Sequence, residues 1–185
     1  MVPVNPFFEN ANRRFLFTMK NRTQYKFILN GSGKECGIID APVPELNVGT
    51  MEKTAQLQIR GYKRSYALYG VTYTVHFRIL DAREKDTGYK LQIFLAVGEV
   101  ATNNYFGWYV YDGRDDILTP LEWKARLSSS RGYNRNKENY GDNVLNMGGM
   151  YALRATIDAL EMEIEMTTDN QSHSTPSMMI RPIVS

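Results

Sequence analysis

The strongest pattern in the sequence is a strict alternation of apolar and polar side chains over two neighbouring segments. In the first segment, residues 71–79, the odd positions carry Val71, Tyr73, Val75, Phe77 and Ile79. In the second segment, residues 89–97, the odd positions carry Tyr89, Leu91, Ile93, Leu95 and Val97. A period of two places each set on one face of a β-strand. Because a polar connection separates them, we expect the two strands to form an antiparallel pair.

Shorter segments predict additional strands. Residues 15–21 and 25–29 flank a short polar segment, and this arrangement predicts two strands that pair as a hairpin around a tight turn. Residues 36–41 fit a short strand, and residues 55–60 alternate as a half-buried strand does. Residues 106–111 predict one more strand, which is rich in aromatic side chains.

One helix start is marked by three residues that each fit a capping position. Thr119 is suited to the N-cap, Pro120 to the first helical position, and Glu122 completes a capping box. The motif predicts a short helix that ends near Leu127.

The segment from Tyr151 to Thr167 fits two periods. Its leucine and isoleucine residues are spaced as on a helix, but Glu161, Glu163 and Glu165 alternate with apolar residues as in a strand. We interpret the segment as mostly strand, although the propensities of Ala, Leu, Met and Glu favour a helix.

Together, these segments predict a mainly β fold, an antiparallel β-sandwich with one or two short flanking helices. A chain of 185 residues with 43% hydrophobic content matches a single domain with its own core. We place the sandwich at residues 15–167, between an N-terminal arm at 1–14 and a C-terminal tail at 168–185. We expect the tail to be disordered as far as Ser177.

Charge and composition argue against several kinds of partner and site. The 22 basic and 20 acidic side chains leave a net charge of +2, which argues against a nucleic-acid partner. Cys36 is the only cysteine, so the chain forms no internal disulfide and no thiolate zinc site. No segment resembles a secretory leader or spans a bilayer. We therefore expect a soluble protein, either secreted without a visible signal peptide or cytoplasmic, that can attach to membranes.

The residues that catalysis requires are scarce. The two histidines are His76, on the polar face of a predicted strand, and His173, in the predicted tail. Neither they nor Cys36 form a motif with a base and an orienting group, so we expect no catalytic residues and no enzyme activity. The acidic run at 112–116 lacks the spacing of a calcium loop, and no phosphate-binding glycine motif occurs. We expect no metal site and no cofactor.

A dense aromatic cluster remains to be explained. It comprises Tyr105, Phe106, Trp108, Tyr109 and Tyr111. In a two-sided strand, Phe106 and Trp108 would face the core, while Tyr105, Tyr109 and Tyr111 would face outward. Tyrosine and tryptophan are also the side chains that settle among lipid headgroups or stack on sugars. Farther along, Arg131 and Tyr133 belong to a polar loop that mixes cations with aromatic rings.

The order of these features resembles that of the actinoporin family of cytolysins and the related fungal fruit-body lectins. The segments that carry the resemblance are LQIFLAVG (91–98), NNYFGWYVYDG (103–113), the capped helix from Thr119, Arg131-Gly132-Tyr133 and ALEMEIEM (159–166). FLFTMKNRT (15–23) is similar to the opening strand of that family. The resemblance implies a sandwich of ten to twelve strands and two helices that binds lipid headgroups through an aromatic loop.

The sequence also departs from that family. Only fourteen residues precede Phe15, and they include Pro3 and Pro6, which leaves little helix to insert into a membrane. Ala96 and Gly98 stand where the headgroup pocket of the family has Ser and Pro, and Trp123 lies on the predicted helix in place of a tyrosine cluster.

We therefore expect a membrane-binding, cytolysin-like protein whose partners are sphingomyelin-like or phosphocholine-like headgroups, with pore formation and homo-oligomers left open. The alternatives are a non-lytic lectin of the fruit-body type and a structural, partner-binding sandwich. The residues expected to bind lipid or glycan are Tyr105, Phe106, Trp108, Tyr109, Trp123, Arg131 and Tyr133.

Overall fold

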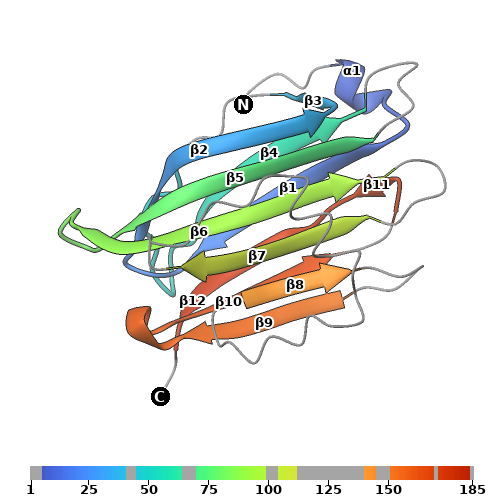
Figure 1. Ribbon diagram of the computed structural model, residues 1–185. Coiled ribbons are helices and arrows are strands. Elements are labelled where there is room, and N and C mark those ends of the chain that lie inside the picture. The colour runs from blue at the N-terminus through green and yellow to red at the C-terminus, as the bar shows by residue number, and fades with distance from the viewer. Residues whose placement is uncertain are drawn as a thin grey trace.

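Two β-sheets packed face to face form the fold (Figure 1). The computed structural model describes residues 6–40, 45–63, 70–98, 104–111, 140–144, 151–168 and 171–183. Sheet A has the order β3-β4-β1-β12-β10-β9, with β11 paired to β1, and sheet B has the order β2-β5-β6-β7-β8. The mainly β sandwich predicted from the alternation is confirmed.

The bounds of the elements are as follows. Sheet A contains β1 (Arg14–Asn21), β3 (Ile38–Ile39), β4 (Ala55–Tyr62), β9 (Tyr151–Ile157), β10 (Met162–Thr168), β11 (His173–Ser174) and β12 (Ser177–Pro182). Sheet B contains β2 (Lys26–Cys36), β5 (Val71–Leu80), β6 (Asp86–Val97), β7 (Tyr105–Tyr111) and β8 (Tyr140–Val144). The short helix α1 (Pro6–Glu9) precedes β1, and the 3-10 helix η1 (Asp158–Leu160) joins β9 to β10.

The two alternating segments form the centre of sheet B. Strands β5 and β6 pair antiparallel, with Val75 opposite Ile93, as the sequence predicts. Their odd-numbered side chains belong to the core between the sheets. From sheet A, the core receives Phe15, Phe17 and Met19 of β1, together with Ile59, Ile164 and Ile180. Each of the two sheets therefore contributes one apolar face, which is how the sandwich buries both.

The predicted opening hairpin is wrong. Strand β1 pairs with β4 in sheet A, whereas β2 pairs with β5 in sheet B. Phe17 and Phe27 nevertheless belong to the same core cluster. The short connection therefore crosses from one sheet to the other, because the two apolar faces meet across the core.

The disorder predicted for residues 168–177 is wrong for the part of them that the structure describes, because His173 and Ser174 form β11 beside β1 and the carbonyl of Pro176 accepts from the N–H of Thr18. The residues that follow are ordered too. Strand β12 lies between β1 and β10, parallel to β1 and antiparallel to β10. Met178 and Ile180 are buried in the core. Their apolar contacts and hydrogen-bonded ladders account for the order of a segment whose flanking residues are polar.

The segment from Tyr151 to Thr167, whose sequence fits both a helical and a strand period, forms strands, as we predicted. Strands β9 and β10 pair antiparallel and are separated by η1. Glu161 ends this short helix in the left-handed conformation, with φ of 47°. The helix predicted from Thr119 to Leu127 lies outside the described residues. Among the described helices, none has both the length and the apolar character needed to cross a membrane.

Candidate functional site

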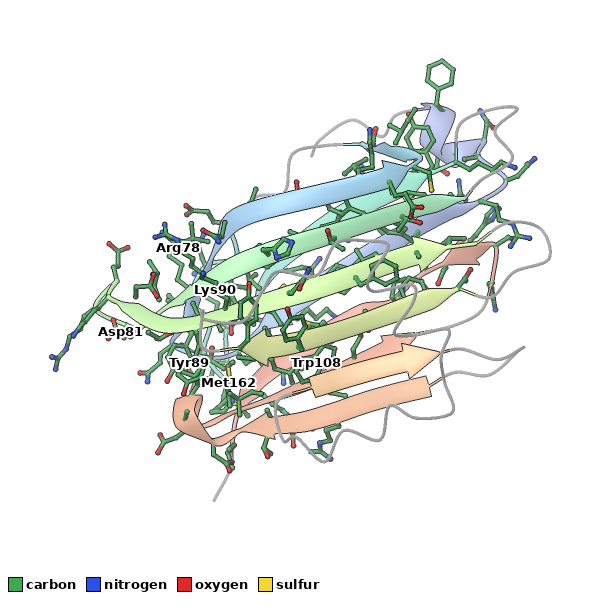
Figure 2. The ribbon with its side chains drawn as sticks, viewed as in Figure 1. Arg78, Asp81, Tyr89, Lys90, Trp108 and Met162 are labelled. Carbon is green, nitrogen blue, oxygen red and sulfur yellow. The ribbon has the colours of Figure 1, made fainter. Side chains whose placement is uncertain are left out.

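Strand β7 holds four of the residues predicted to bind lipid or glycan, and three of them have buried side chains. Phe106 and Trp108 have no exposed surface and belong to the core cluster; Trp108 is labelled in Figure 2. Tyr109 and Tyr111 point to the other face of the sheet, yet each is only 3% exposed, so the expectation that they face solvent is wrong. Phe106, Trp108 and Tyr109 therefore have buried side chains, and their predicted role in binding lipid or glycan stays a prediction.

The remaining predicted residues stay predictions. Tyr105 begins β7, where its backbone pairs with Ala96 of β6. Trp123, Arg131 and Tyr133 lie outside the described residues.

His76 is also buried, although its place on the polar face of β5 predicted exposure. It is 4% exposed, and its Nε2 lies 3.3 Å from Nε2 of Gln92 on β6. Thr72 and Thr74, on the same face, are buried too. Burial, together with the charge of Lys90, lowers the pKa of His76 to about 4. The imidazole is therefore neutral at physiological pH and has no catalytic partner among the described residues.

A cleft of about 310 Å³ opens at the end of the sandwich where β1 ends and β2 begins. We call it the end cleft. It is lined by Arg22, Thr23, Gln24, Tyr25, Gly49, Thr50, Met51, Leu160, Glu161 and Pro182. These residues come from four separate parts of the chain: the β1–β2 connection, the loop before β4, η1 with the residue after it, and the end of β12. The turn after β5, with the labelled Asp81, lies at the same end of the molecule (Figure 2).

The side chain of buried Asn21 fixes two of these segments. Its Nδ2 donates to the carbonyl oxygens of Tyr25 and Asn47, and its Oδ1 accepts from the backbone N–H and the hydroxyl of Thr23. The N–H of Gly49 donates to the carbonyl of Thr23 over 2.8 Å. A Cβ at Gly49 would lie 2.0 Å from the carbonyl oxygen of Asn21, so only glycine fits this close approach. The cleft wall is thus held by buried hydrogen bonds and is preorganised.

The loop before β4 presents apolar side chains beside the cleft. A compact turn holds it, because Thr50 accepts a hydrogen bond from the N–H of Lys53 and donates its own N–H to the Lys53 carbonyl. Val48 is 52% exposed and Met51 53% exposed. On the other side of the cleft, Ile183 is 41% exposed, and its N–H donates to the carbonyl of Glu161. Met51 therefore lines the cleft, while Val48 and Ile183 adjoin its lining residues Gly49 and Pro182 in the sequence.

Opposite charges line the cleft. Arg22 donates its Nε to the hydroxyl of Thr54 over 3.0 Å, and neither Arg22 nor Glu161 forms an ion pair within the described residues. Tyr25 packs against the core with its ring half-buried. Burial raises the pKa of the Tyr25 phenol, and the charges of Glu161 and Asp81 raise it further. The phenol is therefore a neutral hydrogen-bond donor near a carboxylate.

No local pattern in the sequence pointed to the end cleft. Its charged groups, Arg22 and Glu161, are far apart in the chain, and only the pairing of β1 with β12 and of β12 with β10 brings their strands together. The one available signal was the isolated apolar residues Val48 and Met51 in the polar stretch NVGTMEK (47–53).

Comparison with known proteins adds evidence at the level of the fold. No protein-family model matches the chain, and no curated protein sequence matches it significantly. Among solved structures, the chain is similar to the crystal structure of the lipid binding protein Nakanori, with a TM-score of 0.57 and 9% sequence identity. The match covers 94% of this chain and 73% of that one. At this identity the likeness establishes a shared sandwich fold alone.

Proposed function

We propose that the protein binds lipid membranes from one side, using the end of the sandwich that contains the end cleft. One observation carries the proposal. Of the five large hydrophobic side chains that are exposed in the described part of the chain, Met51 lines this cleft, and Val48 and Ile183 adjoin its lining residues Gly49 and Pro182 in the sequence. Exposed apolar side chains gathered at one end of a molecule are typical of sites that bind partners or membranes. The shared fold with a lipid-binding protein supports the same class of function.

The proposed activity is binding, not catalysis. Within the described ranges, no three His, Cys, Asp or Glu side chains are grouped as metal ligands. Cys36 is half-exposed, with its sulfur 3.5 Å from the hydroxyl of Thr72, and the two histidines lie on different sheets. These residues are not arranged as a nucleophile beside a base.

Pore formation and assembly into homo-oligomers are separate steps that the resemblance implies. Both would follow docking on sphingomyelin-like or phosphocholine-like headgroups. Release of calcein from vesicles, measured with binding on the same samples, separates a pore former from a protein that only docks.

The proposal is tested by placing a charge at the apolar residues beside the cleft. We expect Met51→Asp and Val48→Asp each to weaken binding to phosphatidylcholine vesicles, with or without sphingomyelin, by about tenfold or more. Removing one apolar side chain of this size from the interface costs about 1.5 to 3 kcal/mol. Co-sedimentation over a lipid titration measures the affinity.

The matched control is Phe7→Asp. Phe7 is 71% exposed on α1, which precedes the beginning of β1, whereas the cleft lies at the end of β1. Phe7→Asp should bind as the original protein does. Equal losses at both ends would contradict the proposal, and a loss in Tyr105→Ala alone would favour the aromatic loop instead. Retention on a glycan array without vesicle binding would favour the lectin alternative.

A further inference from the structure

We infer that Asn21 is an acceptor for an N-linked glycan whose attachment is incompatible with the fold, so that the protein folds outside any compartment that attaches such glycans. The inference does not depend on the proposed membrane binding. It starts from the tripeptide Asn21-Arg22-Thr23, which has the Asn-x-Thr pattern of an N-glycosylation site. A protein that stays in the cytoplasm and one that is exported without passing a glycosylating compartment both meet this condition.

The reaction at such a pattern needs an accessible carboxamide. The side-chain nitrogen of the asparagine attacks the anomeric carbon of an oligosaccharide carried on a polyprenyl diphosphate. A carbon–nitrogen bond forms while the bond from that carbon to the diphosphate breaks; the nitrogen loses one proton, and the polyprenyl diphosphate leaves. The product keeps a single side-chain N–H and carries a bulky polar group that has to lie at the protein surface.

The folded structure has no place for this product at Asn21. The side chain is completely buried, and its Nδ2 donates to the carbonyl oxygens of Tyr25 over 2.6 Å and Asn47 over 2.9 Å. A carboxamide nitrogen has two hydrogens, so these two bonds use both. Replacing one hydrogen with a sugar would remove a hydrogen bond from a part-buried carbonyl and push the sugar into the segment that holds this carbonyl.

The backbone at Asn21 is enclosed as closely as the side chain. Asn21 pairs with Ala55 of β4 on one side and with Ile180 of β12 on the other, so it cannot turn outward without breaking both ladders. A Cβ at Gly49 would lie only 2.0 Å from the Asn21 carbonyl oxygen. The groups that cover the carboxamide all follow Asn21 in the sequence. An enzyme that modifies the extended chain therefore meets the carboxamide before it is covered.

A second pattern, Asn30-Gly31-Ser32, has the opposite environment and serves as an internal control. Asn30 and Ser32 are exposed, and Asn30 lies where the register of β2 against β5 shifts. Strand β2 forms an edge of sheet B, so a glycan on Asn30 would extend into solvent (Figure 1). The third pattern in the sequence begins at Asn170, which lies outside the described residues.

The test directs the full chain into the secretory pathway of a eukaryotic cell by means of an added leader, with and without tunicamycin, which blocks the assembly of N-linked glycans. The same chain made in the cytosol provides the reference for the folded state. Size-exclusion chromatography and resistance to protease separate folded from misfolded protein. A glycosidase that converts each glycosylated asparagine into aspartate then marks the occupied sites for mass spectrometry.

We expect the glycan at Asn21 to occur only in misfolded protein, whereas Asn30 carries a glycan in folded protein as well. Tunicamycin should restore the folded yield. Thr23→Val removes the pattern at Asn21 and should restore the folded yield without tunicamycin, whereas Asn30→Gln should leave the yield unchanged. Because Thr23→Val also removes the hydroxyl that donates to Asn21, its folding is first verified in the cytosol, and the tunicamycin comparison stands without it.

Folded protein with a glycan on Asn21 would overturn the inference. An unmodified Asn21 in protein from the secretory pathway would overturn it too, because the pattern would then not be an acceptor. A folded yield that tunicamycin leaves unchanged would show that the glycan is not what prevents folding.

Discussion

At the scale of single residues, His76 of β5 lies where its charged form is disfavoured. The ring is buried, its Nδ1 has no hydrogen-bond partner among the described residues, and Lys90 adds a positive charge nearby. The sequence placed His76 on the polar face of a strand correctly, but not its burial. A polar face predicts which way a side chain points, not how much of its surface is exposed. The same reason explains Tyr109 and Tyr111, which point away from the core and are still buried.

The burial of His76 has a consequence for stability at low pH. Because its folded pKa of about 4 lies below the ordinary value of 6.5, the unfolded chain binds the proton more readily. The free energy of unfolding should therefore fall as the pH drops from about 6.5 to about 4, by about 3 kcal/mol in total from this group. Urea unfolding of the original protein and of His76→Gln across this range measures the difference. His173→Gln, at an exposed position, serves as the control, and a pH slope in His76→Gln equal to the original would count against the prediction.

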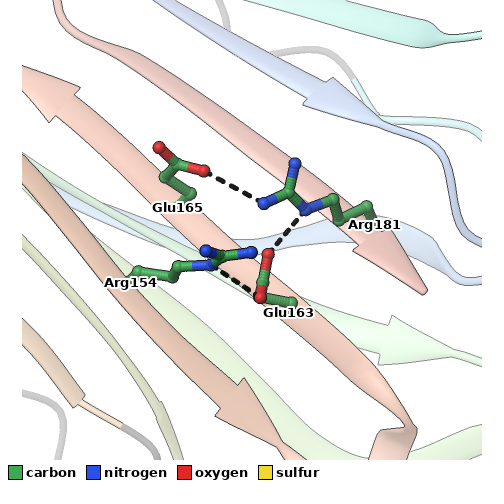
Figure 3. A network of polar contacts seen from close by, with 4 residues as sticks. All are labelled: Arg154, Glu163, Glu165 and Arg181. Carbon is green, nitrogen blue, oxygen red and sulfur yellow. Dashed lines mark hydrogen bonds and ion pairs between the residues drawn. The ribbon is translucent and has the colours of Figure 1, made fainter. Parts of the chain in front are cut away.

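At the scale of elements, the alternation of glutamates in β10 is explained by the neighbouring strands. Glu163 accepts from Arg154 of β9 over 2.6 Å and from Arg181 of β12 over 2.5 Å, and Glu165 lies 3.3 Å from Arg181 (Figure 3). These contacts lie on the outer face of sheet A, while Met162, Ile164 and Met166 fill the core. Tertiary pairing thus overrides the helical propensity of ALEMEIEM, which is why the period of two was the better guide.

Glu163 of β10 forms ion pairs with β9 and β12, so its substitution should lower the free energy of unfolding. The hydrogen bond from Arg154 has the largest effect in lowering the pKa of Glu163, and the hydrogen bond from Arg181 lowers it further. We expect Glu163→Gln to reduce the free energy of unfolding by about 1 kcal/mol, in keeping with a partly exposed ion network. The loss should shrink in concentrated salt, which screens exposed charges. Chemical denaturation at low and high salt measures it.

The control for this prediction is Glu165→Gln, which removes a single, longer contact and should cost less. An equal effect of the two substitutions would show that Glu163 is not the centre of the network.

The positions of the strands were easier to predict from the sequence than the pairing between the strands. The β5–β6 pair, β4 and β7 were all visible as patterns in the sequence. The assignment of β1 and β2 to different sheets was not, because a short polar connection fits both a hairpin and a crossing between sheets. The end cleft could not be predicted from the sequence for a related reason. Its wall consists of such connections, and their relative positions depend on the whole sandwich.

At the scale of the whole molecule, the near balance of charge predicts how membrane binding should respond to salt. The chain carries a net charge of +2, and Lys26, near the cleft end, is already paired with Glu45 and Glu84. We expect affinity for phosphatidylcholine vesicles to change by less than about twofold between about 0.05 M and about 0.5 M salt. Binding that depended on a basic patch would fall much more steeply, at about 1 kcal/mol for each basic side chain near an anionic surface.

Co-sedimentation at several salt concentrations provides this measurement. Vesicles with and without an acidic phospholipid form the comparison. A steep decline with salt, or a strong preference for the acidic vesicles, would contradict the picture of a neutral membrane-facing end.

The parallel pairing of β1 with β12 determines when the fold can be completed. Thr18 lies opposite Ser177, so the inner strands of sheet A join the two extremes of the described sequence. Sheet B, whose pairs β2–β5, β5–β6 and β6–β7 are closer in sequence, can assemble early during synthesis. Sheet A has to wait for its last strand, because contacts between distant segments form slowly. Until β12 arrives, β1 has an open edge, and a growing chain would need protection there from pairing with its neighbours.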